Sequence, residues 1–157
     1  MLKNYVISLA HHSKRQSHIQ QEFAKQHIPF TFFSAVTPDK NTQVAQRLAI
    51  DITKSVSSDT EIACFLSHVS LWQRCVDENL DYIGIYEDDI FLGEQFEQLI
   101  RQTDVFQSQA IDILKLEKVS PRVHLAHPIV LPQSKRTIYE LKSRLRQIGK
   151  VDTLLSR

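Results

Sequence analysis

Three consecutive carboxylates, Glu87-Asp88-Asp89, are the residues of this sequence best suited to chemistry. Like charges held this close together raise one another's pKa unless they recruit a cation. In an extended chain Glu87 and Asp89 point to one side and Asp88 to the other. Two carboxylates on one side suit Mg²⁺ or Mn²⁺, which leave coordination positions for water and substrate phosphates. The triplet therefore predicts a divalent-metal site, and a solvated acidic run on the surface is the alternative interpretation.

The segment before the triplet favours a site at the edge of a sheet. Residues 82–86, Tyr-Ile-Gly-Ile-Tyr, are apolar and short, which is typical of a buried strand. In α/β proteins, ligands bind beyond the carboxyl ends of the strands. The carboxylates follow this strand directly, so we expect them at the end of a central strand.

Strands and helices alternate along the chain, which predicts an α/β fold with a mainly parallel sheet flanked by helices. We expect further strands at Tyr5–Leu9, Phe30–Phe33 and Ile111–Leu116, and helices at Ser13–His27 (with Ser13 as its cap), Pro38–Ile50, Thr60–Asn79 and Glu94–Arg101.

The helix expected at Thr60–Asn79 has the clearest periodicity. Its apolar residues recur at three- and four-residue steps, and we predict that they form a core face: Ile62, Phe65, Leu66, Val69, Trp72 and Val76. Cys64 and Cys75 also lie in this segment, about 16 Å apart along a helix axis. Because a disulfide requires Cα atoms within about 7 Å, these two cysteines cannot pair with each other, which suits a reducing cytosol.

Composition excludes several classes of protein. The only glycines, Gly84, Gly93 and Gly149, rule out a G-x-G-x-x-G dinucleotide motif, a P-loop and a G-x-S-x-G nucleophile elbow. A net charge of +1 gives no reason to expect a nucleic-acid partner. The first ten residues lack a signal peptide's hydrophobic region, and there is no apolar stretch of about 18 residues. We therefore expect a cytoplasmic location.

The end of the chain differs from the body in charge. Residues 135–157 contain seven Lys/Arg and two acidic residues. We expect a basic amphipathic helix at about Thr137–Ile148, either docked on the body or lying on the inner membrane surface as an adaptor would. His124 and His127 have a loose metal-ligand spacing without further ligands, and we interpret them as loop residues.

Five segments in order resemble one family. Tyr82–Ile90 resembles its E-D-D strand, and Glu61–His68 its G-E-x-(G/A)-C-x-L-S-H helix start, with Thr60 replacing the usual glycine. Val6–Leu9 resembles its V-I-x-L first strand, the segment from Phe30 leads to an A-V turn, and Asp112–Glu117 resembles its D-I-(I/L)-K-L-E strand. The chain is on these grounds similar to glycosyltransferase family 25, which contains lipooligosaccharide galactosyl- and glucosyltransferases.

This resemblance implies a GT-A-like (Rossmann-like) fold, a UDP-sugar donor such as UDP-galactose, a lipooligosaccharide acceptor, and Mn²⁺ or Mg²⁺. Residues 1–134 are expected to form a partial nucleotide-sugar-binding domain, with residues 135–157 as its tail. By matched position Asp89 is the metal ligand, with Glu87 as a second candidate. Glu87 faces the ribose or a metal-bound water, and Asp88 orients the loop. The general base remains unassigned.

Three further residues are candidates for donor contacts. Ser8 stands where the family usually has asparagine, His68 ends the L-S-H match, and Lys115 follows from the D-I-(I/L)-K-L-E match. His68 is either a residue at the edge of the core or a site residue that contacts the donor or supports the acidic loop. Lys115 either approaches the diphosphate or forms an ion pair with Asp112 or Glu117.

The resemblance weakens after Arg144. Family members continue from a block like residues 139–144 into a glycine-rich G-T-x-G-Y segment, which the sequence lacks. We expect a truncation or frameshift here, so that the fold is incomplete at its carboxyl end. An inactive remnant that still binds the donor is then the alternative to an active transferase.

Overall fold

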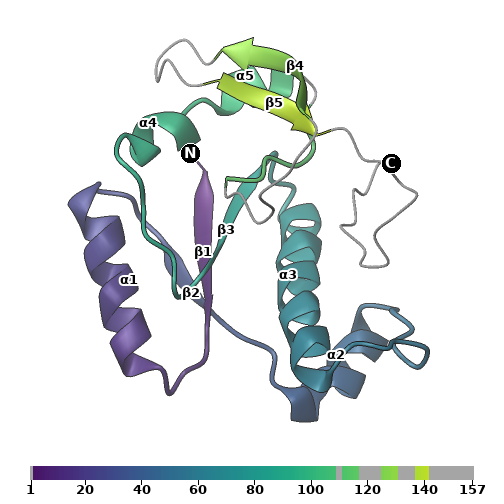
Figure 1. The fold of residues 1–157 in the computed structure, drawn as a ribbon. Helices are drawn as coiled ribbons and strands as arrows, with labels where there is room; N and C mark the ends of the chain where they lie inside the picture. Colours follow the sequence, from purple (N-terminus) through teal and green to yellow (C-terminus); the bar gives the residue numbers. More distant parts are fainter. Residues whose placement is uncertain (1, 109–110, 117–124, 131–136, 142–157) are drawn as a thin grey trace. The chain divides into compact units, whose positions relative to one another are not determined.

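The protein is described by a computed structural model over residues 2–108, 111–116, 125–130 and 137–141. The chain divides into two compact units, Met1–Glu97 (unit 1) and Gln98–Arg157 (unit 2). The secondary structure along the chain is shown in Figure 1. The domain boundary expected near residue 134 stays a prediction.

Unit 1 is built on a parallel sheet of three strands, β1 (Lys3–Ser8), β2 (Thr31–Ser34) and β3 (Ile83–Glu87), in the order β2-β1-β3. All three were expected, within one or two residues. β1 and β3 are paired so that Ile7 lies opposite Glu87. The acidic triplet therefore begins at the carboxyl end of β3, beside the carboxyl end of β1.

Among the described residues β3 pairs with β1 on one side and lies at the edge of the sheet, where a central position with two neighbours was predicted. The expected neighbour at residues 111–116 has no strand conformation, and two of its apolar side chains, Ile113 and Leu116, are exposed. Alternating apolar residues make a strand only where a partner supplies backbone hydrogen bonds. The local sequence carries no information about that partner.

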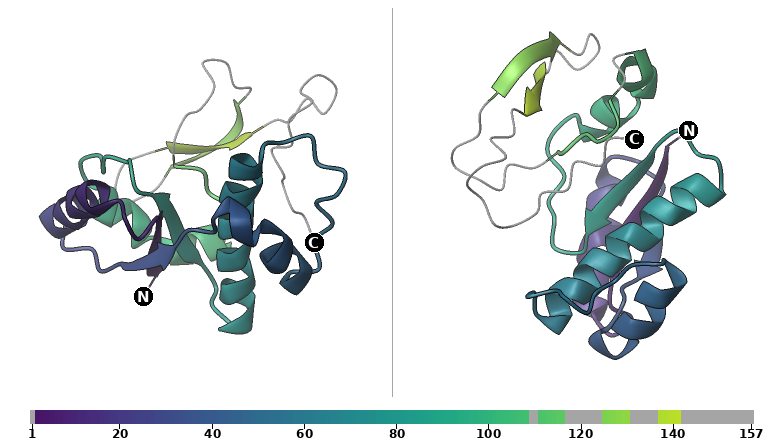
Figure 2. Two further views of the ribbon diagram at one scale, coloured as in Figure 1. Left: turned by 90° about the horizontal axis from the view of Figure 1, so that it is seen from below. Right: turned by 90° about the vertical axis from the view of Figure 1, so that its right-hand side faces the viewer.

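Two helices cover opposite faces of this sheet, α1 (Ser13–Lys25) and α3 (Asp59–Asp77), as Figures 1 and 2 show. On one face Tyr5 and Ile7 of β1 form a core with Leu71 of α3. On the other face Phe23 of α1 packs edge-on against Tyr86 of β3. Because strand side chains alternate between faces, the odd-numbered residues of β3 face α3 and the even-numbered ones face α1.

The helix starts are set by different means. His12 precedes α1 without a side-chain cap, and Ser13 is the first helical residue rather than the expected cap. α3 begins with a capping box, in which Ser58 Oγ accepts from the Glu61 N–H (3.3 Å) and Glu61 accepts from the Ser58 N–H (2.9 Å). The expected helix at Pro38–Ile50 is a 3₁₀ turn, η1 (Pro38–Lys40), followed by α2 (Asn41–Arg47).

The core face of α3 matches the predicted one only in part, since Leu66 is fully buried and Ile62 packs against a core cluster as expected. Its buried residues are Ala63, Leu66, Ser67 and Leu71, whereas Phe65 and Val76 are 41% and 73% exposed. Small residues allow the helix backbone to approach its neighbours, and Ser67 Oγ accepts from the Val36 N–H at 2.9 Å. Hydrophobicity alone misplaced part of the stripe, because it gives small residues and hydrogen bonds no weight.

Unit 2 contains α5 (Thr103–Ser108) and an antiparallel pair, β4 (Leu125–Val130) and β5 (Thr137–Leu141), while α4 (Phe96–Ile100) spans the boundary between the units. His127 therefore lies in a strand rather than a loop. Thr137–Leu141 is also a strand, not the start of a helix, in keeping with its β-branched and aromatic residues. Residues 142–148 of the expected helix lie outside the described residues. In the described part of the chain, no helix is long and apolar enough to cross a membrane.

Candidate functional site

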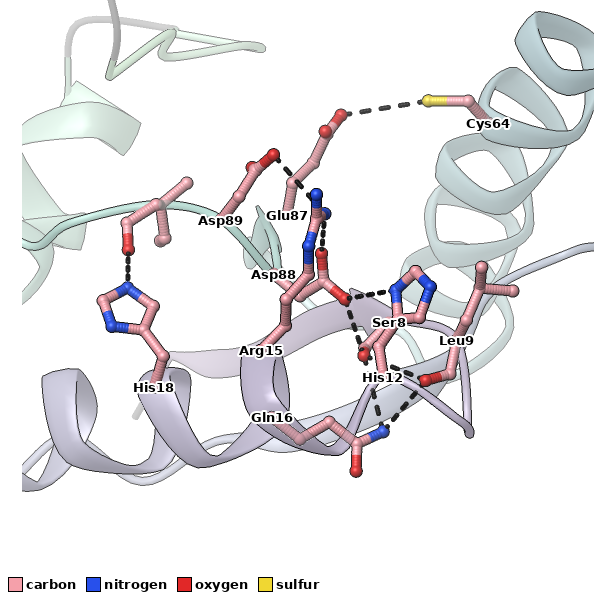
Figure 3. A network of polar contacts seen from close by, with 11 residues as sticks. Ser8, Leu9, His12, Arg15, Gln16, His18, Cys64, Glu87, Asp88 and Asp89 are labelled. Atoms are coloured by element: carbon pink, nitrogen blue, oxygen red, sulfur yellow. Dashed lines mark hydrogen bonds and ion pairs between the residues drawn. The ribbon is translucent and has the colours of Figure 1, made fainter.

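The carboxylates of the triplet alternate between two sides of the chain, as expected. In Figure 3 Glu87 and Asp89 extend to one side of the loop, and Asp88 turns toward Arg15 and His12. The side chains of Glu87 and Asp89 are 54% and 58% exposed, whereas that of Asp88 is only 8% exposed. Two acids are thus open to a ligand, and the third is inside the protein.

Asp88 is held by three residues of unit 1. Ser8 Oγ donates to its Oδ2 at 2.8 Å, and Arg15 Nη1 donates to its Oδ1 at 2.8 Å. His12 Nδ1 lies 3.6 Å from Oδ2. Burial raises the pKa of Asp88, but the bonds from Arg15 and Ser8 outweigh it and hold that pKa below its ordinary value. Asp88 is therefore a charged anchor whose oxygens are already occupied.

Arg15 links this anchor to the exposed acid. Its Nη1 also lies 3.5 Å from Asp89 Oδ2, and about half of the Arg15 side chain is exposed. Arg15 was not among the residues predicted from the sequence. The signal available was its place in the first turn of the helix that follows β1, the edge of the sheet where α/β proteins bind ligands.

Glu87 projects toward α3, where it meets two residues one helical turn apart. His68 Nε2 lies 3.4 Å and Cys64 Sγ 3.8 Å from Glu87 Oε1. Hydrogen bonding to Cys64, and next to Glu87, raises the pKa of His68 to about 9 despite partial burial. His68 in turn lowers the pKa of Glu87. At neutral pH, Glu87 is a carboxylate beside an imidazolium.

α1 also fixes the loop that follows the triplet. His18 and Glu22 on one side of α1, and Gln26 directly after it, bind backbone groups that follow the triplet with their side chains. The helix and this segment therefore restrain each other. The bonds are His18 Nε2 to the Ile90 carbonyl (2.8 Å), Glu22 accepting from the Leu92 N–H (3.0 Å), and Gln26 donating to the Gly93 carbonyl (2.9 Å) and accepting from the Glu97 N–H (3.1 Å).

The residues predicted for the site are only partly brought together. Ser8 contacts Asp88 and His68 contacts Glu87, so both lie within the triplet's surroundings. Lys115 belongs to unit 2, and its contact with a diphosphate stays a prediction. Glu87 and Asp89 have exposed carboxylate oxygens, whereas both oxygens of Asp88 are already engaged by Ser8 and Arg15, and the metal role of the two exposed acids stays a prediction.

Comparisons with known proteins found a matching family model and curated relatives. The family model described as "Glycosyltransferase family 25 (LPS biosynthesis protein)" matches residues 1–149. A Haemophilus influenzae protein with the name "Putative glycosyltransferase" is 47% identical over 73% of this chain and 41% of its own length. The lipooligosaccharide biosynthesis protein lic2B of H. influenzae is 37% identical over 89% of the chain and 54% of its length.

A Neisserial relative matches across almost the whole chain. The lacto-N-neotetraose biosynthesis glycosyltransferase LgtE of Neisseria gonorrhoeae is 33% identical over 99% of this chain and 57% of its own length. The chain thus spans about half the length of these curated relatives.

Proposed function

Because the chain belongs to glycosyltransferase family 25, we propose that it forms the donor-binding part of an enzyme that transfers a hexose from a UDP-sugar to a lipooligosaccharide acceptor. Galactose is the proposed hexose, and a GT-A-like fold is the proposed scaffold. The names of the relatives lic2B and LgtE support the acceptor class. The chain's sheet and helices support an α/β scaffold of this kind.

One observation carries the proposal: the triplet stands at the carboxyl end of β3 with Asp88 anchored and the acids on either side of it exposed. Strand ends are where α/β sheets bind nucleotides. Anchoring the middle acid fixes the backbone that carries the other two, so the exposed carboxylates need little reordering when a ligand binds.

Asp89, together with Glu87, is the proposed holder of a Mn²⁺ or Mg²⁺ ion. Such an ion, when bound, supplies Lewis-acid stabilisation of the negative charge that develops on the leaving UDP. Asp88 orients the loop through Ser8 and Arg15. The guanidinium of Arg15, half exposed beside Asp89, offers a positive charge to donor phosphates on the same side of the site.

Donor binding and transfer are tested separately, because a chain can bind UDP without completing the reaction. Calorimetry with UDP and Mn²⁺ should give saturable binding that is absent without the metal. Asp89→Asn should weaken that binding at least about tenfold, since it removes one charged ligand. Asp81→Asn, an exposed acid ahead of β3, is the matched control and should bind as the natural protein does.

Equal binding by the Asp89→Asn variant and the natural protein would remove Asp89 from the metal site. Transfer itself is measured with UDP-galactose and purified lipooligosaccharide. Saturable UDP binding without transfer supports the donor-binding role and overturns the transferase role for this chain.

A further inference from the structure

A second set of possible ligands lies on the α3 side of the triplet. The ligand atoms of Cys64, His68 and Glu87 all lie within 4.8 Å of one another. Cys64 and His68 are four residues apart on α3, and therefore present their side chains on the same face of the helix. Glu87 reaches them from the end of β3, so two separate elements of unit 1 converge there.

We propose that Cys64, His68 and Glu87 form a binding site for a thiophilic transition-metal ion of the Zn²⁺ type. Thiolate, neutral imidazole and carboxylate are the three ligand types that proteins use for zinc. Binding of the ion therefore releases the proton that the His68 imidazolium carries at neutral pH, together with the Cys64 thiol proton. A Mg²⁺ or Mn²⁺ site is instead built from oxygen ligands. This inference shares Glu87 with the proposed Mn²⁺ or Mg²⁺ site, but it does not require glycosyl transfer. Cys64 and His68 belong to this site alone, so their variants test it separately from the Asp89 variant.

The distances fit a single ion. With zinc bonds of about 2.0 Å to nitrogen or oxygen and 2.3 Å to sulfur, tetrahedral geometry separates N and O ligands by about 3.3 Å and S and O ligands by about 3.5 Å. The structure has His68 Nε2 at 3.4 Å and Cys64 Sγ at 3.8 Å from Glu87 Oε1. Both distances are close to these values, and the ligand atoms of Cys64 and His68 lie within 4.8 Å of each other, a separation that must close to about 3.5 Å when one ion is held by both.

The backbone positions of the three ligands are well fixed. Glu87 lies opposite Ile7 in the β1–β3 pairing, and the capping box at Ser58 fixes the start of α3 ahead of Cys64. Three protein ligands leave the fourth tetrahedral position to water or a small exchangeable ligand. Cys64 and Glu87 are exposed, which gives an ion direct access.

Cobalt provides a direct probe of the site, because a thiolate bound to Co²⁺ gives an intense charge-transfer absorption in the near ultraviolet. The reduced, chelator-treated chain should bind one Co²⁺ with this absorption, and Zn²⁺ should displace it. Cys64→Ser should abolish the absorption, and His68→Ala or Glu87→Gln should weaken Co²⁺ binding at least about tenfold. Cys64 and Glu87 are exposed, so their replacement should leave the circular dichroism spectrum unchanged.

Cys75→Ser is the matched control, because Cys75 lies further along α3 and bonds instead to the Leu80 carbonyl at 3.2 Å. It should keep both the absorption and the affinity. A second measurement follows alkylation by iodoacetamide, in which Zn²⁺ should protect Cys64 but not Cys75. The proposal is overturned if Co²⁺ gives no charge-transfer absorption, if Cys75→Ser removes it, or if Zn²⁺ leaves the alkylation rate of Cys64 unchanged.

Discussion

The guanidinium of Arg15 donates to the carboxylate of Asp88 at 2.8 Å, across 73 residues of sequence. This ion pair separates the acidic triplet into one structural member and two exposed members. Arg15 lies in the first turn of α1 and Asp88 directly after β3, so the bond also joins the helix to the end of the sheet. Consecutive carboxylates are tolerated here because the middle one is neutralised from within the fold.

Asp88→Asn should therefore destabilise the protein, whereas Asp89→Asn should not. Asp88 is buried and accepts from Ser8 and Arg15, so its neutral replacement weakens two hydrogen bonds and leaves an amide facing donors. We expect a loss of about 1–3 kcal/mol in the free energy of unfolding, measured with urea. Asp89→Asn, at an exposed position, should stay within about 0.5 kcal/mol. Equal losses in the two variants would refute the division of roles.

A glycine pair offers a test of the packing behind the site. A Cβ on buried Gly84 would lie closer than 3.0 Å to the Tyr86 hydroxyl and to Asn4 Oδ1, which are hydrogen-bonded to each other at 3.1 Å. Tyr86 is fixed against Phe23, so it has little room to move. Gly84→Ala should cost about 1–3 kcal/mol of unfolding free energy.

Gly93→Ala is the control for that substitution, because a Cβ there meets nothing within 4 Å and the residue has no positive φ. Its thermal midpoint should match the natural protein. A Gly84→Ala protein that melts at the same temperature as Gly93→Ala would contradict the packing described for β3.

The sequence was sufficient to predict the elements around the site, because their signals are local. The apolar run before Glu87 and the alternation of Glu87 and Asp88 required no knowledge of distant residues. Residues whose role depends on long-range contacts were missed. An example is Arg15 of α1, whose partner Asp88 follows β3 in the sequence. The burial of Ser67, whose Oγ accepts from the Val36 N–H, was likewise missed because no hydrophobic period reveals it.

Glu22 should make stability depend on pH in the acid range. It is buried, pairs with Lys25 and accepts from the Leu92 N–H, and these bonds hold its pKa below the ordinary value of 4.5. A lowered pKa in the folded state means that the contribution is complete above pH 4.5 and is lost as pH falls through the lowered value. Glu22→Gln should therefore differ most from the natural protein at pH 7.

Urea unfolding at pH 7 and at pH 3 measures this dependence. The stability difference between the natural protein and Glu22→Gln should shrink at the lower pH, and the exposed Asp81→Asn control should show no comparable change. A difference that grows as pH falls would contradict the assigned role of Glu22.

His68 should titrate far above the usual range for histidine. Hydrogen bonding to Cys64, and then to Glu87, raises its pKa from an ordinary 6.5 to about 9. Because the folded-state pKa is raised, the stabilisation is complete below pH 6.5 and is lost as pH rises through about 9. In chelator-treated protein, NMR of the imidazole protons should give a midpoint near that value, and Cys64→Ser should lower it more than Cys75→Ser does. A midpoint near 6.5 in the natural protein would show that the imidazole, thiol and carboxylate do not interact in solution.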